Sequence, residues 1–208
     1  SACSMTASGR ATVAALQYCA AGPSQETLAF LLPMIGEAAE QGAGIVSLPE
    51  AATFLAPNRK ALEDEAEDEA ESRTLDALRN CAAAQGIDLH VGSIFLRRAD
   101  GRLVNRAAMI GADGSVRALY DKIHMFDANV GDGKRYRESD YFAAGDRMVM
   151  TESGGWQLGL SICYDVRFPH LYRQLGLAGA EMIMVPAAFT YPSGRAHWHV
   201  LLRARAIE

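Results

Sequence analysis

The first fifty residues alternate short apolar runs with one amphipathic stretch. Residues 12–18 (TVAALQY) and 45–48 (IVSL) have the apolar character of buried strands, and Pro49 stops the second run. Residues 23–41 between them predict a helix with Ser24 as its N-cap. This order predicts a βαβ unit, in which a crossover helix joins two parallel strands.

The middle of the chain changes to an antiparallel pattern. Residues 57–85 predict a helical region that is split near Ser72 and ended by Gly86. Three strands follow, each separated from the next by an Asp-Gly pair, at residues 88–96, 103–110 and 116–122. Because Asp-Gly between two such runs is a hairpin signal, we expect an antiparallel meander added to the βαβ start.

The last third combines a long polar stretch with further short elements. Residues 124–147 are rich in Gly and Asp and predict a long loop, which in a compact domain is usually functional or mobile. Residues 148–151 and 156–162 predict the two strands of a hairpin. A helix at residues 169–177, a strand at 182–185 and a last helix at 196–207 are predicted to follow. The whole order predicts an α/β fold with a mixed sheet system and helices outside it.

Composition narrows the class of protein. The 208 residues carry 25 acids against 20 Lys and Arg, and half of them are apolar, which suits an α/β domain with a substantial core. Seven of the acids lie in residues 63–71 (EDEAEDEAE), a run that we interpret as a solvated face or a lid segment. The chain has no basic field to collect phosphates, and no apolar run approaches the roughly 18–20 residues of a membrane span. We therefore expect neither nucleic acid nor a membrane as a partner.

Cysteine and histidine spacing gives no sign of a metal site. No C-x-x-C pair occurs among the four cysteines, which are Cys3, Cys19, Cys81 and Cys163. We expect free thiols in a reducing compartment, the cytoplasm. His197 and His199 lie two residues apart on a predicted helix and do not share a face, so no metal is expected there.

Three predicted strands end in side chains that can do chemistry. Cys163 follows the apolar strand in LGLSICYDVRFP, Glu50 follows IVSLP, and Lys122 ends the strand that precedes the long loop. Taken singly, the cysteine is most often a small core residue, the carboxylate a turn residue and the lysine a solvated one. Together, a carboxylate can take the thiol proton, a thiolate can attack a carbonyl, and an ammonium can hold the oxyanion. A nearby helix N-terminus would favour the thiolate, and Glu138 in the loop could hold Lys122.

These residues lie in stretches that resemble a known family. The segments IVSLPE, YDKIHMFD, SICYDVRFP and PAAF…AHWHVLLRARAIE are similar to the nitrilase, or carbon–nitrogen hydrolase, superfamily, and most of all to its Nit-type amidases. The resemblance implies a catalytic set of Glu50, Lys122 and Cys163, with Glu138, 25 residues before the cysteine, as a second glutamate. It also implies an αββα sandwich of two mixed sheets, usually paired into a homodimer or larger homo-oligomer.

The resemblance further implies amide hydrolysis through a thioester, with no metal or organic cofactor. Glu50 would move the protons, while Lys122 and the backbone N–H of Tyr164 would stabilise the oxyanion. The implied substrates are small-molecule amides of a small carboxylate or an α-keto acid, of the deaminated glutathione or α-ketoglutaramate type.

Such substrates need a cation for their carboxylate. Arg167, four residues after the cysteine, and Arg195 are candidates. Arg167 can equally form a structural ion pair with a helix end. Phe189, Thr190 and Tyr164 are candidate pocket walls. Phe126 and Asp127 in HMFD are expected to shape the loop.

We predict that residues 1–9 form a flexible leader and residues 10–208 a single carbon–nitrogen hydrolase domain. Relatives of this kind continue beyond RARAIE, so we expect the family's C-terminal strands to be missing from this chain.

Several other functions stay open from the sequence. Within the superfamily, the alternatives are a nitrilase or an N-carbamoyl amidohydrolase. A non-catalytic scaffold subunit is another, although the chain keeps all three candidate catalytic side chains. An isochorismatase-like cysteine hydrolase would carry its acid at the first strand, where this chain offers only Gln17 and Tyr18.

Overall fold

The computed structural model describes residues 9–129 and 135–208, so the predicted leader, apart from Gly9, lies outside the described residues. The helices are α1 (Ser24–Glu40), α2 (Arg59–Glu65), α3 (Arg73–Gln85), α4 (Pro169–Leu177) and α5 (Tyr191–Ile207). The first six strands are β1 (Val13–Ala15), β2 (Ile45–Ser47), β3 (Glu67–Asp68), β4 (Asp88–Arg97), β5 (Leu103–Ile110) and β6 (Val116–Asp121). The later strands are β7 (Asp127–Asn129), β8 (Arg135–Arg137), β9 (Met150–Ser153), β10 (Trp156–Leu160) and β11 (Met182–Met184), and two 3₁₀ turns are η1 (Glu138–Asp140) and η2 (Cys163–Arg167).

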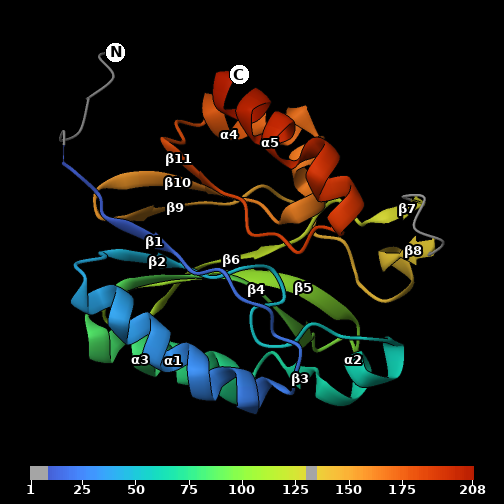
Figure 1. The fold of residues 1–208 in the computed structure, drawn as a ribbon, viewed down its shortest axis with the longest axis horizontal. Helices are drawn as coiled ribbons and strands as arrows, with labels where there is room; N and C mark the ends of the chain where they lie inside the picture. The colour runs from blue at the N-terminus through green and yellow to red at the C-terminus, as the bar shows by residue number, and fades with distance from the viewer. Residues whose placement is uncertain (1–8, 130–134) are drawn as a thin grey trace.

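Nine of the described strands form two mixed sheets that face each other, and β7 and β8 pair as a separate two-stranded sheet. One sheet has the order β1-β2-β4-β5-β6, with β3 paired to β4, and the other has the order β11-β10-β9. β1, β2 and β4 run parallel, whereas β4, β5 and β6 are antiparallel, as the Asp-Gly turns predicted. Helices α1 and α3 cover the outer face of the larger sheet, and α4 and α5 cover the smaller one (Figure 1). The fold is therefore the expected αββα sandwich.

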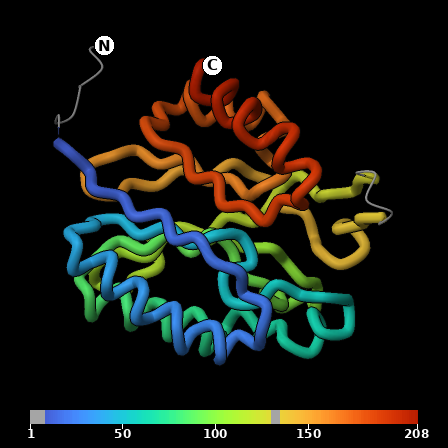
Figure 2. Tube along the Cα trace, viewed as in Figure 1, coloured from blue at the N-terminus to red at the C-terminus, as the bar shows by residue number. Residues whose placement is uncertain are grey.

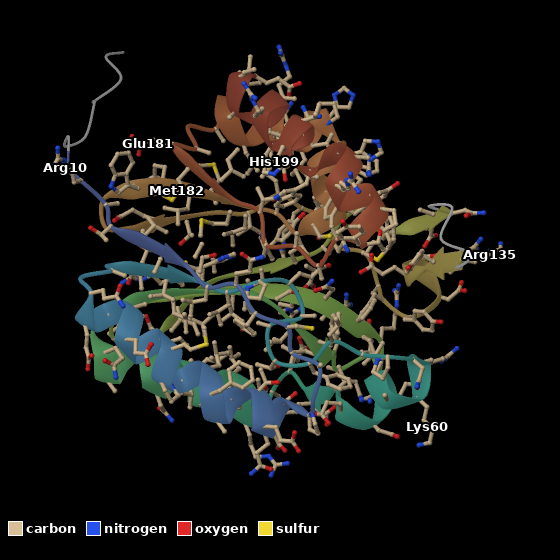
Figure 3. All side chains as sticks on the ribbon, viewed as in Figure 1. Arg10, Lys60, Arg135, Glu181, Met182 and His199 are labelled. Carbon is tan, nitrogen blue, oxygen red and sulfur yellow. The ribbon has the colours of Figure 1, made fainter. Side chains whose placement is uncertain are left out.

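Three apolar layers hold these four layers together. Leu31 and Ile35 of α1 pack with Leu89 of β4 between helices and sheet. Between the two sheets, Tyr120 of β6 packs with Leu160 of β10. Under α4, a third cluster contains Val166, Leu171, Tyr172 and Leu175. Figure 3 shows how densely side chains fill the space between the sheets. The strands that lead to Glu50, Lys122 and Cys163 are thus fixed by core packing.

The first strand differs from its prediction. Residues 12–18 were expected to form a buried strand, but β1 spans only Val13–Ala15, and Val13 is 40% exposed. The reason is topological, because β1 pairs with β2 alone and lies at the edge of the sheet. Figure 2 traces this segment along that edge before the chain turns into α1. Ser24 is not the N-cap of α1. Pro23 takes that position, and the backbone N–H of Ser24 donates to Glu65 Oε1 at 2.7 Å.

The acidic run is a bonded segment as well as a solvated one. The predicted helix at residues 57–85 is interrupted by β3, and Ser72 caps α3 by accepting from the N–H of Leu75 at 3.0 Å. Glu67 accepts from the Ser72 hydroxyl at 2.7 Å, and Glu69 pairs with Arg106. These bonds fasten the run against β4 and β5, which composition could not indicate.

The predicted loop at residues 124–147 contains regular structure. β7 and β8 pair as an antiparallel hairpin, and η1 follows directly. The helix predicted at residues 196–207 begins earlier, at Tyr191, where Pro192 occupies the first turn. None of the helices in the described ranges combines the length and apolar character that crossing a bilayer requires.

A close backbone approach fixes the segment that follows β2. The pairing of β4 with β5 shifts register between Val91 and Ile94, and a Cβ placed on Gly92 would collide with the carbonyl oxygens of Leu48 and Pro49. Beside it, Ser93 Oγ accepts from the backbone N–H of Ala51 at 3.0 Å. This irregularity in β4 therefore holds the chain on both sides of Glu50.

We expect Gly92→Ala to lower the free energy of unfolding by about 1–3 kcal/mol, because the backbone of two neighbouring residues must move to admit the methyl group. Gly176→Ala in α4 is the matched control, since a Cβ there meets no atom within 4 Å. It should leave stability unchanged or raise it by up to about 1 kcal/mol. Urea unfolding of both variants measures the difference, and equal effects would contradict the close approach.

Candidate active site

The structure brings the four predicted side chains together at one end of the sandwich. Glu50 follows β2, Lys122 follows β6, Glu138 opens η1, and Cys163 follows β10 as the first residue of η2. Lys122 lies at the centre, with its side chain 2% exposed. Its Nζ donates to Glu50 Oε1 at 3.0 Å and to the two carboxylate oxygens of Glu138 at 2.9 and 2.8 Å. The site is thus a buried ammonium between two carboxylates.

Glu50 is held in its ionised form. Its Oε1 also accepts from Asn105 Nδ2 at 3.0 Å, and its Oε2 accepts from the backbone N–H of Ala188 at 2.8 Å. Burial alone would raise the pKa of Glu50. The Lys122 charge and the hydrogen bonds from Cys163, Lys122 and Ala188 outweigh burial, so its pKa lies below the ordinary value. The carboxylate is available to accept a proton.

Cys163, in contrast to Glu50, is held in its neutral form. Its thiol is buried and hydrogen-bonded to Glu50, and its pKa is raised well above the ordinary value by burial and by the Glu50 charge, against the opposing Lys122 charge. The expected stabilisation of a thiolate by a helix N-terminus is therefore wrong. The turn at Cys163 is the five-residue η2, and α4 begins only at Pro169. The resting side chain is a thiol that needs a base.

Lys122 stays charged despite its burial. Desolvation lowers its pKa, but the negative charges of Glu50 and Glu138 raise it above the ordinary lysine value. Glu138 is itself fixed, because its Oε2 accepts from the backbone N–H of Phe126 at 2.6 Å. The long loop is thereby tied to the end of β6.

Backbone strain marks the same place. Among the non-glycine residues that the structure describes, only Ala51 and Cys163 have positive φ, at 53° and 50°. Each such conformation costs about 1–3 kcal/mol and persists only where the surroundings enforce it. Cys163 is held by its N–H, which donates to the Pro186 carbonyl at 2.8 Å, and Ala51 is held by Ser93.

Asn105 is a site residue that the sequence analysis missed. Its amide Nδ2 donates to Glu50 at 3.0 Å and to Glu138 at 3.3 Å, so it bridges the two carboxylates from β5. Its Oδ1 is buried and has no hydrogen-bond partner among the described residues. A buried amide in the apolar strand LVNRAAMI was the available signal, because such a group needs partners.

A cavity of about 360 Å³ opens onto this cluster. Tyr164, Phe189 and Thr190 lie in its wall, as the resemblance implied, and Phe126 lines it as well as shaping the loop. Further aromatic side chains line it, namely Phe95, Tyr136, Tyr141 and Phe142. The walls are therefore mainly aromatic around a charged floor, which is typical of a small-molecule site.

The cations of the cavity differ from those expected. Arg167 is not among the lining residues. Its guanidinium contacts His197 Nδ1 at 3.1 Å and lies 5.7 Å from the ring centre of Tyr164, so its role in substrate binding stays a prediction. Arg195 is exposed on α5. The arginines that do line the cavity are Arg59, Arg135 and Arg137, and Figure 3 shows Arg135 at the outer end of the β7–β8 hairpin.

The remaining cysteine and histidine predictions can be placed for the described ranges. Cys19, Cys81 and Cys163 are free thiols. Within residues 9–129 and 135–208, no three His, Cys, Asp or Glu side chains gather in a way that could hold a metal ion.

Comparison with known proteins shows the family of this chain. Residues 12–208 match the model of the carbon–nitrogen hydrolase family. The chain is 37% identical over 201 residues to a deaminated glutathione amidase of Yersinia enterocolitica, covering 95% of this chain and 70% of that protein. It is 34% identical to omega-amidase NIT2 of Xenopus tropicalis, covering 93% and 69%.

A solved structure gives the same result for the fold. The NitFhit protein of C. elegans superposes with a TM-score of 0.85 at 33% identity, over 95% of this chain and 49% of that one. The chain therefore belongs to the carbon–nitrogen hydrolase family, within the nitrilase superfamily, and is a hydrolase that acts on carbon–nitrogen bonds.

The opposing charges around Cys163 predict how its reactivity responds to substitution. At pH 8, Lys122→Met should slow alkylation of Cys163 by iodoacetamide, because the cation that lowers the thiol pKa is lost. Glu50→Gln should speed it, because the charge that raises that pKa is removed. Mass spectrometry of the Cys163 peptide measures both rates, with alkylation of Cys19 as the internal control. Changes of the same sign in both variants would contradict the electrostatics of the cluster.

Proposed function

We propose that this protein is a thiol amidase that hydrolyses the carboxamide of a small carboxylate or α-keto acid to the acid and ammonia through a thioester on Cys163. The observation that carries the proposal is that one carboxylate, Glu50, contacts both the Cys163 thiol and the Lys122 ammonium. A base, a nucleophile and a cation within one buried cluster at the floor of a cavity are what acyl transfer from an amide requires.

In the first step Glu50 accepts the thiol proton while Cys163 Sγ bonds to the carboxamide carbon. The electron pair of the carbonyl moves onto its oxygen, where Lys122 and the backbone N–H of Tyr164 stabilise the negative charge. Lys122 contacts both oxygens of Glu138 at 2.9 and 2.8 Å. One of these bonds can be exchanged for the oxyanion without leaving Glu138 unpaired.

In the following steps Glu50 returns its proton to the amide nitrogen, the carbon–nitrogen bond breaks, and ammonia leaves a thioester behind. Glu50 then takes a proton from water as the water oxygen attacks the thioester carbon. The carbon–sulfur bond breaks, the sulfur regains the proton from Glu50, and the acid departs. Glu138 and Asn105 touch the groups that react and keep Lys122 and Glu50 in place.

Ammonia release is the direct test. The protein is offered α-ketoglutaramate, deaminated glutathione, an N-carbamoyl amino acid and a simple nitrile. We expect release from one of the first two, and loss of release to background in Cys163→Ala, because the attacking sulfur is gone. Cys81→Ala is the matched control, since Cys81 is a free, half-buried thiol on α3. Retained turnover in Cys163→Ala would overturn the proposal.

The same assay distinguishes the alternative functions, which are nitrilase, N-carbamoyl amidohydrolase and non-catalytic scaffold. Release only from the carbamoyl compound or the nitrile would move the protein to an N-carbamoyl amidohydrolase or nitrilase. A scaffold subunit would release no ammonia from any compound.

Two observations support a substrate that carries a carboxylate on a longer acyl chain. The related proteins of Yersinia and Xenopus are named for deaminated glutathione and omega-amide chemistry. The cavity of about 360 Å³ also has room beyond a carboxamide, with Arg59, Arg135 and Arg137 in its wall. Arg59 already pairs with Glu63 at 2.6 Å. Arg137, next to Glu138 in the chain, is therefore our candidate for the carboxylate.

Arg137→Ala should raise KM about tenfold or more for the preferred carboxylate-bearing amide and leave kcat within about twofold. A charge-assisted hydrogen bond to the substrate is lost, which is worth about 1.5–3 kcal/mol. Arg167→Ala, on the sequence-predicted cation, is measured beside it, and steady-state kinetics on an amide without a carboxylate is the control. If Arg167→Ala alone raised KM, the sequence prediction would hold and Arg137 would be excluded.

We also infer that the protein works as a homo-oligomer in the cytoplasm. Leu177, Tyr191, Val200 and Ile207 on α4 and α5 are 68–85% exposed, and a partner subunit on this helical layer would cover some of them. The free thiols fit a reducing compartment.

A further inference from the structure

A buried carboxylate outside the proposed chemistry lies two residues after Cys163. Asp165 is fully buried and accepts four hydrogen bonds. Its Oδ2 accepts from the Tyr120 hydroxyl at 2.7 Å and from the backbone N–H of Ile162 at 2.8 Å. Its Oδ1 bonds the backbone N–H of His124 at 3.0 Å and His124 Nδ1 at 2.7 Å. Every partner of Asp165 can donate a hydrogen bond, so both of its carboxylate oxygens are engaged.

Two of the donors to Asp165 flank Lys122 at equal distances in the sequence. Tyr120 lies two residues before Lys122, and His124 lies two residues after it. Asp165 itself lies two residues after Cys163, in the same 3₁₀ turn. One carboxylate therefore fastens both flanks of Lys122 to the turn that presents Cys163.

A ring contact braces the same joint from outside. The imidazole of His124 stacks on Phe168, with ring centres 3.6 Å apart and planes inclined by 10°. Phe168 follows η2 directly, and its backbone N–H donates to the carbonyl of Asp165 at 2.9 Å. The end of β6 and the nucleophile's turn are thus joined by hydrogen bonds and by stacking.

We propose that Asp165 is a positioning residue that sets the separation between the Lys122 ammonium and the Cys163 thiol, acting through Tyr120 and His124. This inference rests on the proposed function, because it gives that separation a role in acylation. Charge pairs and reacting groups are sensitive to displacements of about 1 Å, and β6 and β10 belong to different sheets. Asp165 provides the link between them beside the site.

A phenol deletion with a matched control separates positioning from stability. Tyr120→Phe removes the bond to Asp165. Tyr172→Phe removes a similarly buried phenol whose hydroxyl contacts Ser161 Oγ at 2.8 Å, before Cys163 in the chain, and not a residue that flanks Lys122. Each deletion should lower the melting temperature to a similar extent, because each removes a hydrogen bond of a buried hydroxyl. We expect Tyr120→Phe to lower kcat about tenfold with KM within about twofold, and Tyr172→Phe to leave both within about twofold.

Alkylation of Cys163 by iodoacetamide at pH 8 gives a readout that does not depend on turnover. If Asp165 positions Lys122, Tyr120→Phe slows alkylation, because the cation that favours the thiolate has moved away. If Asp165 only stabilises the fold, the loosened turn exposes the thiol and alkylation becomes faster. Faster alkylation, or equal effects of the two phenol deletions on kcat, would overturn the proposal.

Asp165→Asn completes the series, since it places an amide N–H against donors and should reduce kcat and alkylation further. A melting curve for each variant establishes that it is folded. Absence of ammonia release by the unaltered protein would count against the proposed amidase, whereas the alkylation series still decides whether Asp165 positions the pair.

Discussion

The buried ammonium of Lys122 is the constraint on which this site depends. A charge with its side chain only 2% exposed is tolerated when it is paired and hydrogen-bonded, and is very costly otherwise. Glu50 and Glu138 supply the pairing from two distant segments, so the ends of β2 and β6 and the start of η1 must meet. Such a pair adds little net stability. Its effect is to penalise every arrangement in which one partner is absent, and this selects one register for three segments.

The backbone is strained at two of the residues that surround the ammonium. Glu50 is followed by Ala51 at φ 53°, and Cys163 itself has φ 50°. Neither conformation is favourable for an L-residue, and both persist because neighbouring strands hold them. Ser93 of β4 holds Ala51, and the carbonyl of Pro186, which follows β11 of the other sheet, holds Cys163. The free energy gained by packing the sandwich therefore offsets the backbone strain at the candidate active site.

Local sequence patterns predicted those parts of the fold that local signals determine. β5 and α4 have the predicted bounds, because Asp-Gly turns and Pro169 delimit them. The β7–β8 hairpin was missed, since its polar residues carry no apolar alternation and the adjacent Glu138 is held by a bond to Lys122 across the fold. The edge position of β1 also depends on long-range pairing.

The candidate site was predictable in part for a similar reason. Glu50, Lys122 and Cys163 each follow an apolar run, so their common location could be inferred from strand ends. Asn105 and Asp165 could not be placed, because their partners lie in distant segments of the chain. The thiolate stabilisation expected from a helix N-terminus was wrong, because α4 begins only at Pro169 and burial raises the pKa of Cys163. A helix N-terminus is a local feature, whereas burial beside Glu50 is a tertiary one and has the larger effect on its pKa.

The arrangement of charges also explains how a thiol with a raised pKa can serve as a nucleophile. Proton transfer from Cys163 to Glu50 moves one negative charge between two groups that both face Lys122. The ammonium keeps an anionic partner throughout, so the transfer neither creates nor removes net charge in the buried cluster. Its cost is therefore well below that of ionising an isolated buried thiol, where the full desolvation penalty would apply. Under the proposed mechanism, Glu138 is the second requirement, because it keeps Lys122 paired while Glu50 is protonated.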